Sequence, residues 1–401
     1  MGSKAVLLQK GLGDLIKKES LQAKRFVDLF TGAAHVAHFA ASNTSLPVIA
    51  LDLQTYGAIL AGAVVERTKG IDQKQLESSW LRPSIYNATR SRCWSTACGL
   101  EEKASVLRLI EEAREFSASE ESVGPILRAY GGYYFSPTQA LILDHLLAAL
   151  PQSEILRKIC LATAICVASR CAASPGHTAQ PFHPTLKGGR YIREAWQKSP
   201  EDLSRQYLEF FCNLYARRKG QTFVSDALIF AEHLKPHDLV FVDPPYSDVQ
   251  YSRFYHVLET VAVGYCGVVS GSGRYPARDQ RPQSDFSKRT TSLKAMEMLI
   301  ERLNAARATA IFTFPAGSSS NGVSGEELDT LARKYFKVNR FLVNGTFSTL
   351  GGNNSHREPT QVAEELIMVL KPTGRARRSV GPRIGVSRFH HRQPIAARAR
   401  G

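Results

Sequence analysis

The fold of this chain is decided by a short apolar run that ends in two prolines, Leu239-Val240-Phe241-Val242-Asp243-Pro244-Pro245-Tyr246. Four consecutive apolar residues are typical of a strand that is buried on both faces of a sheet. Proline donates no backbone hydrogen bond, so the strand must end at Asp243 and the chain must turn out of the sheet. In an open α/β sheet, ligands bind at the carboxyl ends of the strands. The turn therefore presents an acid, two carbonyl groups and an aromatic ring where a ligand is expected; a plain strand-ending turn is the alternative.

Two strand-and-helix units lie near the start of the chain. Residues 25–30 are typical of a strand and lead into small residues, Thr31-Gly32-Ala33-Ala34, at the start of an alanine-rich helix. Small residues let the backbone approach a ligand, and a helix N-terminus offers unpaired N–H groups. Residues 48–51 predict a second strand that ends at Asp52, where nucleotide-binding folds hold a ribose. Each signal is weak alone, because Asp52 could instead cap the helix predicted over 56–65.

The strand–helix alternation stops from about residue 66 to residue 202. The early part of this block is polar and predicts irregular structure, with aromatic and basic residues interleaved: Trp80, Arg82, Tyr86, Arg90, Arg92 and Trp94. That mixture suits stacking and phosphate contact, although half-exposed packing is at least as common. Its later part predicts helices over 101–116, 136–150 and 153–170, the second opened by a capping box of Ser136 and Gln139. The block is therefore expected to be a largely helical inserted subdomain.

The alternation resumes at about residue 203. Strands are predicted over 222–226, 309–314, 338–342 and 366–370, and helices over 203–215, 228–234, 251–263, 293–303 and 324–335. Residues 271–288 are polar and basic and predict a long surface loop, which is often functional near a strand end. The whole pattern predicts an α/β fold in which a helical insert interrupts a mostly parallel sheet.

Composition restricts the class of protein. The 401 residues are 43% hydrophobic and 22% charged, which is ordinary for a globular protein. The seven cysteines show no zinc-binding spacing, so we expect buried, reduced thiols and no metal. No run reaches the about 18 apolar residues of a membrane span, and no signal-peptide core follows Met1, so a cytoplasmic protein is expected.

The net charge of +15 is concentrated at the C-terminal end. Residues 371–401 hold eight arginines, one lysine and no acid, which is more than half of the excess. A basic balance favours a polyanionic partner, with nucleic acid first. For the tail alone, a solvated segment that aids solubility is an equally good interpretation.

The order of these elements resembles the adenine-specific (N6) DNA methyltransferases that use S-adenosyl-L-methionine. It is most similar to the class whose target-recognition insert lies between the cofactor motifs and the catalytic Asp-Pro-Pro-Tyr motif, which residues 243–246 match in full. Residues 28–34 resemble the family's F-x-G-x-G loop, with Ala34 in place of the last glycine. The resemblance covers about residues 1–370. It implies a Rossmann-like methyltransferase sheet built from residues 1–66 and 203–370, with a helical target-recognition insert at 67–202. Residues 371–401 lie outside the resemblance, and we expect them to form a disordered basic tail.

The resemblance also assigns the site. Catalysis falls to Asp243, Pro244, Pro245 and Tyr246, and binding of S-adenosyl-L-methionine to Gly2, Ser3, Lys4, Asp28, Phe30, Gly32, Asp52 and Asp226. The Asp243 carboxylate and the Pro244 carbonyl would accept the two N–H bonds of the adenine amine and localise its lone pair, and Tyr246 would offer a flat face to the base. The base must be flipped out of the duplex to reach them. The expected partners are double-stranded DNA, gripped by the insert and loop 271–289, and a cognate restriction endonuclease in a restriction-modification system.

Three other functions remain open at this point. Cytosine-N4 methylation is less favoured, because such relatives more often carry Ser where this chain has Asp243. Methylation of adenine in RNA is a further possibility. A non-catalytic nucleic-acid-binding relative would explain Ala34 and the basic tail, and the intact motif argues against it.

Overall fold

The computed structural model describes residues 4–103, 105–119, 124–348 and 360–373. Its centre is a seven-stranded sheet in the order β3-β2-β1-β4-β7-β9-β8. The strands are β1 (Arg25–Asp28), β2 (Val48–Asp52), β3 (Gln221–Val224), β4 (Asp238–Val242), β7 (Thr309–Pro315), β8 (Phe336–Ser348) and β9 (Thr360–Pro372). β1, β2, β3, β4 and β7 pair in parallel, and β9 runs antiparallel between β7 and β8. The predicted α/β class and all seven predicted strands are confirmed, although β8 and β9 are much longer than expected.

The central strand β4 is apolar from Leu239 to Val242 because helices cover both faces of the sheet. Successive residues of β4 alternate between the two faces: Leu239 and Phe241 join one core cluster, and Val240 and Val242 join the other. This alternation follows from the two-residue period of a strand. A solvent-facing side would have required polar residues at every second position, which explains why an uninterrupted apolar run marks a central strand.

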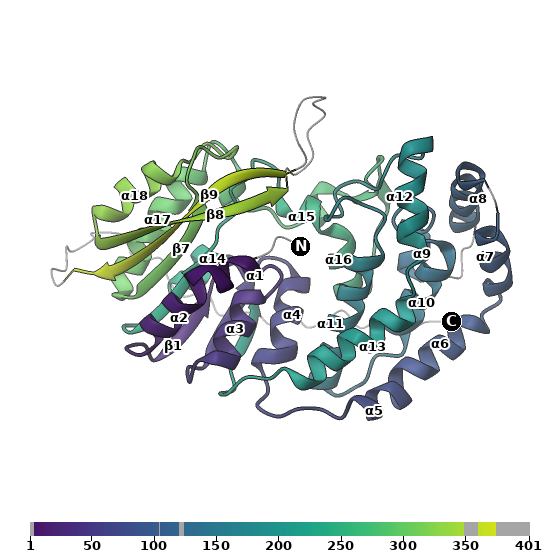
Figure 1. Cartoon of the computed structure of the whole chain (residues 1–401), viewed down its shortest axis with the longest axis horizontal. Helices are drawn as coiled ribbons and strands as arrows, with labels where there is room; N and C mark the ends of the chain where they lie inside the picture. The colour runs from purple at the N-terminus through teal and green to yellow at the C-terminus, as the bar shows by residue number, and fades with distance from the viewer. Residues whose placement is uncertain (1–3, 104, 120–123, 349–359, 374–401) are drawn as a thin grey trace.

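Each face of the sheet has its own set of helices (Figure 1). On one face lie α14 (Ala227–Ala231), α17 (Ser292–Ala306) and α18 (Gly325–Arg333), whose apolar residues form the second core cluster. The other face carries the N-terminal helices α1 (Lys4–Leu7) and α2 (Gly13–Ser20), joined by a kink within Leu8–Leu12, together with α3 (His35–Asn43) and α4 (Thr55–Val65). The capping box predicted at the start of α18 forms between Ser324 and Glu327.

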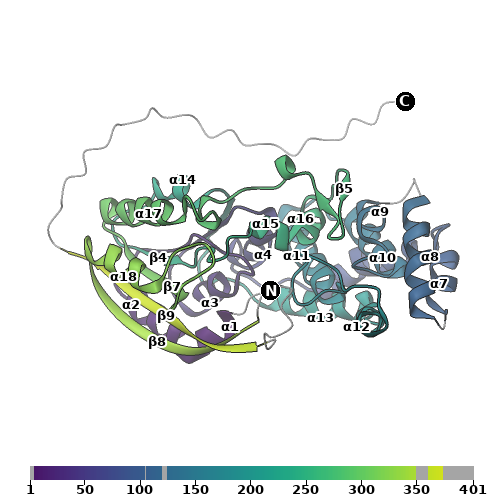
Figure 2. The ribbon, with the colours of Figure 1, turned by 90° about the horizontal axis from the view of Figure 1, so that it is seen from above.

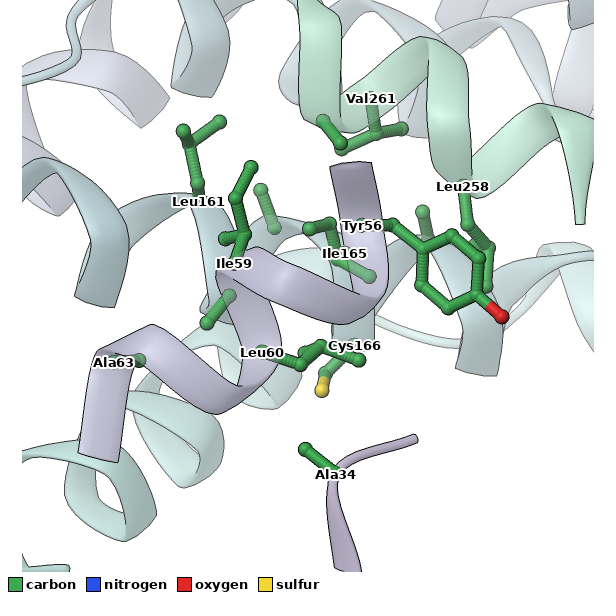
Figure 3. Close-up of a cluster of buried hydrophobic side chains, with 14 of the residues drawn as sticks. Ala34, Tyr56, Ile59, Leu60, Ala63, Leu161, Ile165, Cys166, Leu258 and Val261 are labelled. Atoms are coloured by element: carbon green, nitrogen blue, oxygen red, sulfur yellow. The ribbon is translucent and has the colours of Figure 1, made fainter. Parts of the chain in front are cut away.

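The region predicted as an insert is helical and extends from one end of the sheet (Figure 1). It holds α5 (Gln73–Leu76), α6 (Arg82–Thr89), α7 (Trp94–Glu101), α8 (Val106–Ser119), α9 (Pro125–Tyr130), α10 (Pro137–Ala148), α11 (Glu154–Cys171) and α12 (Leu186–Trp196), followed by α13 (Pro200–Asn213). Ser136 and Gln139 form the predicted capping box of α10. In Figure 3, Leu161, Ile165 and Cys166 of α11 face Ile59 and Leu60 of α4, so one core runs from the sheet into this region.

The prediction of irregular structure after residue 66 is wrong. α5, a π-helical turn at Glu77–Leu81, α6 and α7 fill most of residues 73–101. Leu76, Trp80 and Ala88 are fully buried at roughly helical spacing, and the Trp80 indole donates a hydrogen bond to the Leu146 carbonyl at 2.9 Å. The polar residues between them hid this apolar stripe. Trp80 therefore serves packing rather than stacking on a ligand, whereas the Arg90 guanidinium lies 4.8 Å from the ring centre of the exposed Tyr86.

The helix predicted over 251–263 is divided in two at Tyr255. α15 (Tyr251–Phe254) and α16 (His256–Val263) meet there, with Tyr255 at φ −127° and ψ 20°. The His256 Nδ1–H donates to the Arg253 carbonyl at 3.0 Å, and in a continuous helix that carbonyl would accept the Val257 amide instead. The loop after α16 contains a short hairpin of β5 (Val269–Ser270) and β6 (Tyr275–Pro276).

Within the described part of the chain, no helix is both long enough and apolar enough to cross a membrane. Gly2, Ser3 and all but the first three residues of the predicted basic tail lie outside the described residues.

Candidate active site

Three acids lie at or just beyond the carboxyl ends of adjacent strands. Asp28 ends β1, Asp52 ends β2, and Asp243 follows the last residue of β4. Because β1 pairs in parallel with both β2 and β4, these strands end at the same edge of the sheet. In the register of β1 and β4, Asp28 lies opposite Phe241, which is two residues before Asp243. The structure thus brings together the predicted catalytic acid, Asp243, and two of the predicted cofactor-binding acids.

The Asp243 carboxylate is held by two partners on one oxygen. Its Oδ1 accepts a hydrogen bond from the Thr313 hydroxyl at 2.8 Å and lies 2.9 Å from Lys4 Nζ. Thr313 comes from β7, the neighbouring strand, and is fully buried. A buried hydroxyl and an ammonium on the same carboxylate oxygen fix the rotamer of this side chain. Asp243 is therefore a pre-positioned acceptor at the centre of the sheet.

Lys4 also forms an ion pair with Glu365 of β9, so it lies between two carboxylates. Burial alone would lower the pKa of Lys4, but the facing carboxylates outweigh it and raise this pKa above its ordinary value. Burial raises the pKa of Glu365, and the Lys4 charge opposes that rise. Removing one partner from a buried pair typically costs about 3–5 kcal/mol, because the remaining charge is left without compensation. The N-terminal helix is thereby tied to the turn at Asp243–Tyr246.

The two prolines are anchored by a buried amide. Asn321 is fully buried, and its Nδ2 donates to the carbonyls of Pro245 at 2.9 Å and Phe286 at 3.0 Å. The Ser292 hydroxyl donates to the Asn321 carbonyl at 2.8 Å, which links this contact to the start of α17. Proline already restricts the backbone, and Asn321 fixes the turn against the rest of the fold.

Tyr246 completes the turn on the side of α15. Its ring lies edge-on to Phe314, with 6.5 Å between the ring centres. Burial raises the pKa of Tyr246. The neutral phenol and the fixed ring leave a flat aromatic surface beside Asp243.

Asp52 lies beside two glycines, Gly32 and Gly57. Its Oδ2 accepts the Gly32 N–H at 2.7 Å, and its Oδ1 accepts the Gln54 N–H at 2.8 Å. A methyl group built on Gly57 would lie only 2.9 Å from the Asp52 Cβ and Cγ, so α4 can approach this acid only with glycine at that position. Burial raises the pKa of Asp52 to about 6, although the two N–H bonds oppose the rise. A buried acid beside a small-residue turn fits the ribose hydroxyls of a nucleoside cofactor.

The remaining predicted residues lie around this centre in different roles. Burial raises the pKa of Asp28 well above its ordinary value, and its Oδ1 accepts the Phe30 N–H at 3.3 Å. The Phe30 ring meets Phe286 edge-on at 5.0 Å. Asp226 follows β3 and caps α14, accepting the Leu228 N–H at 2.8 Å. Asp226 thus lies beyond the carboxyl end of a fourth parallel strand, while its carboxylate is engaged at a helix start.

Ala34 adopts the left-handed conformation, with φ 63° and ψ 10°. This conformation costs a residue with a Cβ about 1–2 kcal/mol, whereas glycine adopts it freely. Ala34 is fully buried and packs near Leu60 and Cys166 (Figure 3). The departure from the F-x-G-x-G pattern therefore falls where glycine is conformationally favoured, and the chain keeps the same backbone with alanine.

Sequence reasoning missed four residues that support the site: Thr313, Asn321, Glu365 and Glu259. Both Glu259 carboxylate oxygens accept N–H groups at the start of α4, from Thr55 at 2.9 Å and Tyr56 at 3.0 Å. Thr313 interrupts the apolar residues 310–314 of β7, and that interruption was the available signal. Glu365 follows Glu364 just before the apolar run 366–370 of β9 and gave no such signal. Among the described residues, no group of three His, Cys, Asp or Glu side chains is arranged to hold a metal ion.

Comparisons with known proteins agree with this geometry. Residues 152–272 match the family model described as D12 class N6 adenine-specific DNA methyltransferase, and this segment includes β4 and the Asp243–Tyr246 motif. The chain is also similar to the modification methylase StsI of Streptococcus sanguinis, with 27% identity over 162 residues. That alignment covers 40% of this chain and 23% of the relative, so the chain matches less than a quarter of that protein's length. The segment from residue 152 to residue 272 is therefore similar to the D12 class of N6 adenine-specific DNA methyltransferases, and the similarity to StsI is distant.

Proposed function

We propose that this protein transfers a methyl group from S-adenosyl-L-methionine to N6 of an adenine that has been flipped out of double-stranded DNA. The observation that carries the proposal is the fixed Asp243 carboxylate at the end of β4, with Thr313 and Lys4 on its Oδ1. The family match and the parallel sheet support the same reaction class.

The chemistry follows from the amine to be methylated. The exocyclic nitrogen of adenine is a poor nucleophile, because its lone pair is delocalised into the ring. Asp243 Oδ2 and the Pro244 carbonyl accept its two N–H bonds and localise the lone pair on nitrogen. Much of the acceleration then comes from positioning and from dipoles that are fixed before the reaction. S-adenosyl-L-methionine, when bound, supplies an electrophilic methyl group on a sulfonium centre.

The remaining residues bind and orient the two substrates. Asp52 is assigned to the ribose hydroxyls of the cofactor, and Asp28, Phe30, Gly32 and Asp226 to its surroundings. Gly2, Ser3 and Lys4 are assigned to the methionine end. Of these, Lys4 has an additional role, because its ammonium sets the orientation of Asp243. Tyr246 offers its ring to the face of the flipped base, and the helical region from 67 to 202 is assigned to reading the target sequence.

The decisive experiment identifies the methylated nucleoside. The full chain is incubated with DNA and S-adenosyl-L-methionine, the DNA is digested to nucleosides, and the products are identified by mass. We expect N6-methyldeoxyadenosine. N4-methyldeoxycytidine, or transfer only to RNA, would reject the proposed base or substrate. Absence of both transfer and calorimetric cofactor binding at millimolar concentration would reject the enzyme and favour a non-catalytic relative.

A further inference from the structure

An unusual group of arginines surrounds Tyr275 on the hairpin that follows α16. The Arg253 guanidinium lies 4.6 Å from the centre of the Tyr275 ring, and the Arg281 guanidinium lies 5.6 Å from it. Two guanidinium groups therefore lie against the same aromatic ring. The positive charge of Arg278 also acts on Arg281 and adds to the repulsion between Arg253 and Arg281. We refer to Arg253, Arg278, Arg281 and Tyr275 as the Tyr275 cluster.

The charge of the Tyr275 cluster is not balanced within the described part of the chain. None of the ion pairs found among the described residues involves its three arginines. Asp279 follows Arg278 directly, but it is exposed and forms none of these ion pairs either. Burial, followed by the charges of Arg253 and Arg278, lowers the pKa of Arg281. Like charges gathered without a counter-charge favour the binding of an anion.

The backbone around the cluster is firmly fixed. The Tyr134 hydroxyl donates to the Thr178 carbonyl at 2.7 Å and lies 3.0 Å from the Gly273 carbonyl. The Arg274 Nε–H donates to the Ala129 carbonyl of α9 at 2.7 Å, and the Tyr275 hydroxyl donates to the Ala179 carbonyl. In Figure 2, β5 lies beside α16 and near α9. The hairpin is thus fastened to the helical region, and the Tyr275 ring is held in place before any ligand arrives.

The cluster is linked to the catalytic turn through α15. Arg253 belongs to this helix, which begins five residues after Tyr246. Loop 281–287 is joined to the same turn, because Asn321 Nδ2 donates to the carbonyls of both Pro245 and Phe286. The Gln250 side chain makes two hydrogen bonds with the Ser284 backbone, at 2.9 Å and 2.7 Å, and so fixes loop 281–287 to the start of the same helix. An anion bound by the cluster would therefore keep a defined position relative to Tyr246.

A second pair of arginines continues this surface onto the helical region. Arg114 and Arg274 lie 4.2 Å and 4.5 Å from the centre of the Tyr133 ring. Arg274 precedes Tyr275 directly, so the two arginine groups are adjacent. Arginine pairs with phosphate oxygens through a planar fork of N–H donors, and an aromatic ring beneath the fork holds it in place.

We propose that the Tyr275 cluster binds backbone phosphates of the DNA strand that carries the target adenine. This inference rests on the proposed function and adds which residues hold the DNA beside the catalytic turn. Phosphate contacts set the register of a duplex without reading its sequence, and they hold the strand while one base leaves the stack. The Arg114 and Arg274 pair extends the same track toward the helical region.

The test compares Arg253→Gln and Arg278→Gln, both at exposed positions, with Arg218→Gln as the matched control. Arg218 is also exposed but lies just before the first residue of β3. It is therefore at the amino ends of the parallel strands, whereas Asp243 lies at their carboxyl ends. Binding of a short DNA duplex is measured from about 50 to 300 mM salt, with an RNA duplex and inorganic phosphate as separate probes. We expect each cluster variant to weaken DNA binding about tenfold on any sequence and to reduce the salt slope by about one, with Arg218→Gln leaving both unchanged.

Unchanged DNA affinity and slope in both cluster variants would overturn the inference. So would a loss confined to the RNA duplex or to inorganic phosphate. Calorimetric binding of S-adenosyl-L-methionine to the unmodified protein separates this result from a failure of the proposed function. If the cofactor binds while the variants keep their DNA affinity, only the cluster assignment fails. If the variants lose DNA affinity while the cofactor does not bind, only methyl transfer fails.

Discussion

At the scale of single residues, this site depends on polar groups that are buried and fully engaged. Lys4, Thr313 and Asn321 each contribute hydrogen bonds that fix Asp243 or the prolines after it. The sequence pattern pointed to Asp243–Tyr246, because two prolines after an apolar strand force a turn. It could not reveal the supporting residues, because each reaches the turn from a distant segment. Glu365, for example, lies opposite Pro315 only through the register of β7 and β9.

Ala34 provides a prediction at this scale. Ala34→Gly deletes a fully buried methyl group, worth about 1 kcal/mol, but relieves a left-handed backbone that costs about 1–2 kcal/mol. We therefore expect a change in the free energy of unfolding within about 1 kcal/mol of zero. The control is Ala37→Gly, also fully buried but inside α3, where the loss should be about 2 kcal/mol. Urea denaturation measures both; equal losses would show that Ala34 is not strained.

At the scale of elements, the N-terminus of α4 is fitted closely to the end of β2. Glu259 of α16 accepts the first N–H groups of α4, and Gly57 lets that helix pass Asp52. The sequence predicted both elements and the acid between them. It did not predict how closely α4 approaches Asp52. Glycine is required at position 57 because of this contact and not because the chain turns there.

Gly57→Ala tests this contact. Alanine favours a helix over glycine by about 1 kcal/mol, but its methyl group would lie 2.9 Å from Asp52 and displace the carboxylate. We expect the protein to remain folded while its affinity for S-adenosyl-L-methionine falls about 10- to 100-fold, the value of a lost hydrogen bond to a charged group. Gly62→Ala, in the same helix and in contact with Lys158 and Thr222 instead, is the control. Isothermal titration calorimetry gives both affinities, and equal values would reject this role for Gly57.

At the scale of the whole molecule, the sheet and the helical region share one core. Leu161 and Ile165 of α11 belong to the same core cluster as Phe26 and Phe241 of the sheet. The strand–helix rhythm predicted the sheet well, because buried parallel strands need unbroken apolar runs. It failed over residues 66–101, where a narrow apolar stripe containing Trp80 supports helices whose other faces are polar. How the helices pack is a property of tertiary contacts, which local periodicity does not contain.

Two buried histidines predict how stability depends on pH. Burial lowers the pKa of His38 and of His256 to about 4, while each ring donates a hydrogen bond to a carbonyl, of Leu60 and Arg253 respectively. Their ordinary pKa of about 6.5 applies in the unfolded chain. Because the folded-state pKa is lower, their contribution is complete above pH 6.5 and is lost as the pH falls toward 4, by up to about 3 kcal/mol each.

Urea denaturation at pH 7.5, 5.5 and 4.5 measures this loss. The double variant His38→Gln and His256→Gln should be less stable at pH 7.5 but should lose less between pH 7.5 and 4.5 than the unmodified protein. An equal loss in both proteins would show that other groups cause the acid sensitivity.

The central claim is that the Asp243 carboxylate accepts an N–H of the adenine amine. Asp243→Asn keeps the shape of the side chain but replaces one acceptor oxygen with a donor. The control is Asp248→Asn, an exposed acid in the same loop. We expect the turnover number for methyl transfer to fall by about 10²- to 10³-fold in Asp243→Asn, with DNA affinity largely retained and the control unchanged. A turnover number equal to that of the unmodified protein in Asp243→Asn would contradict the assigned role.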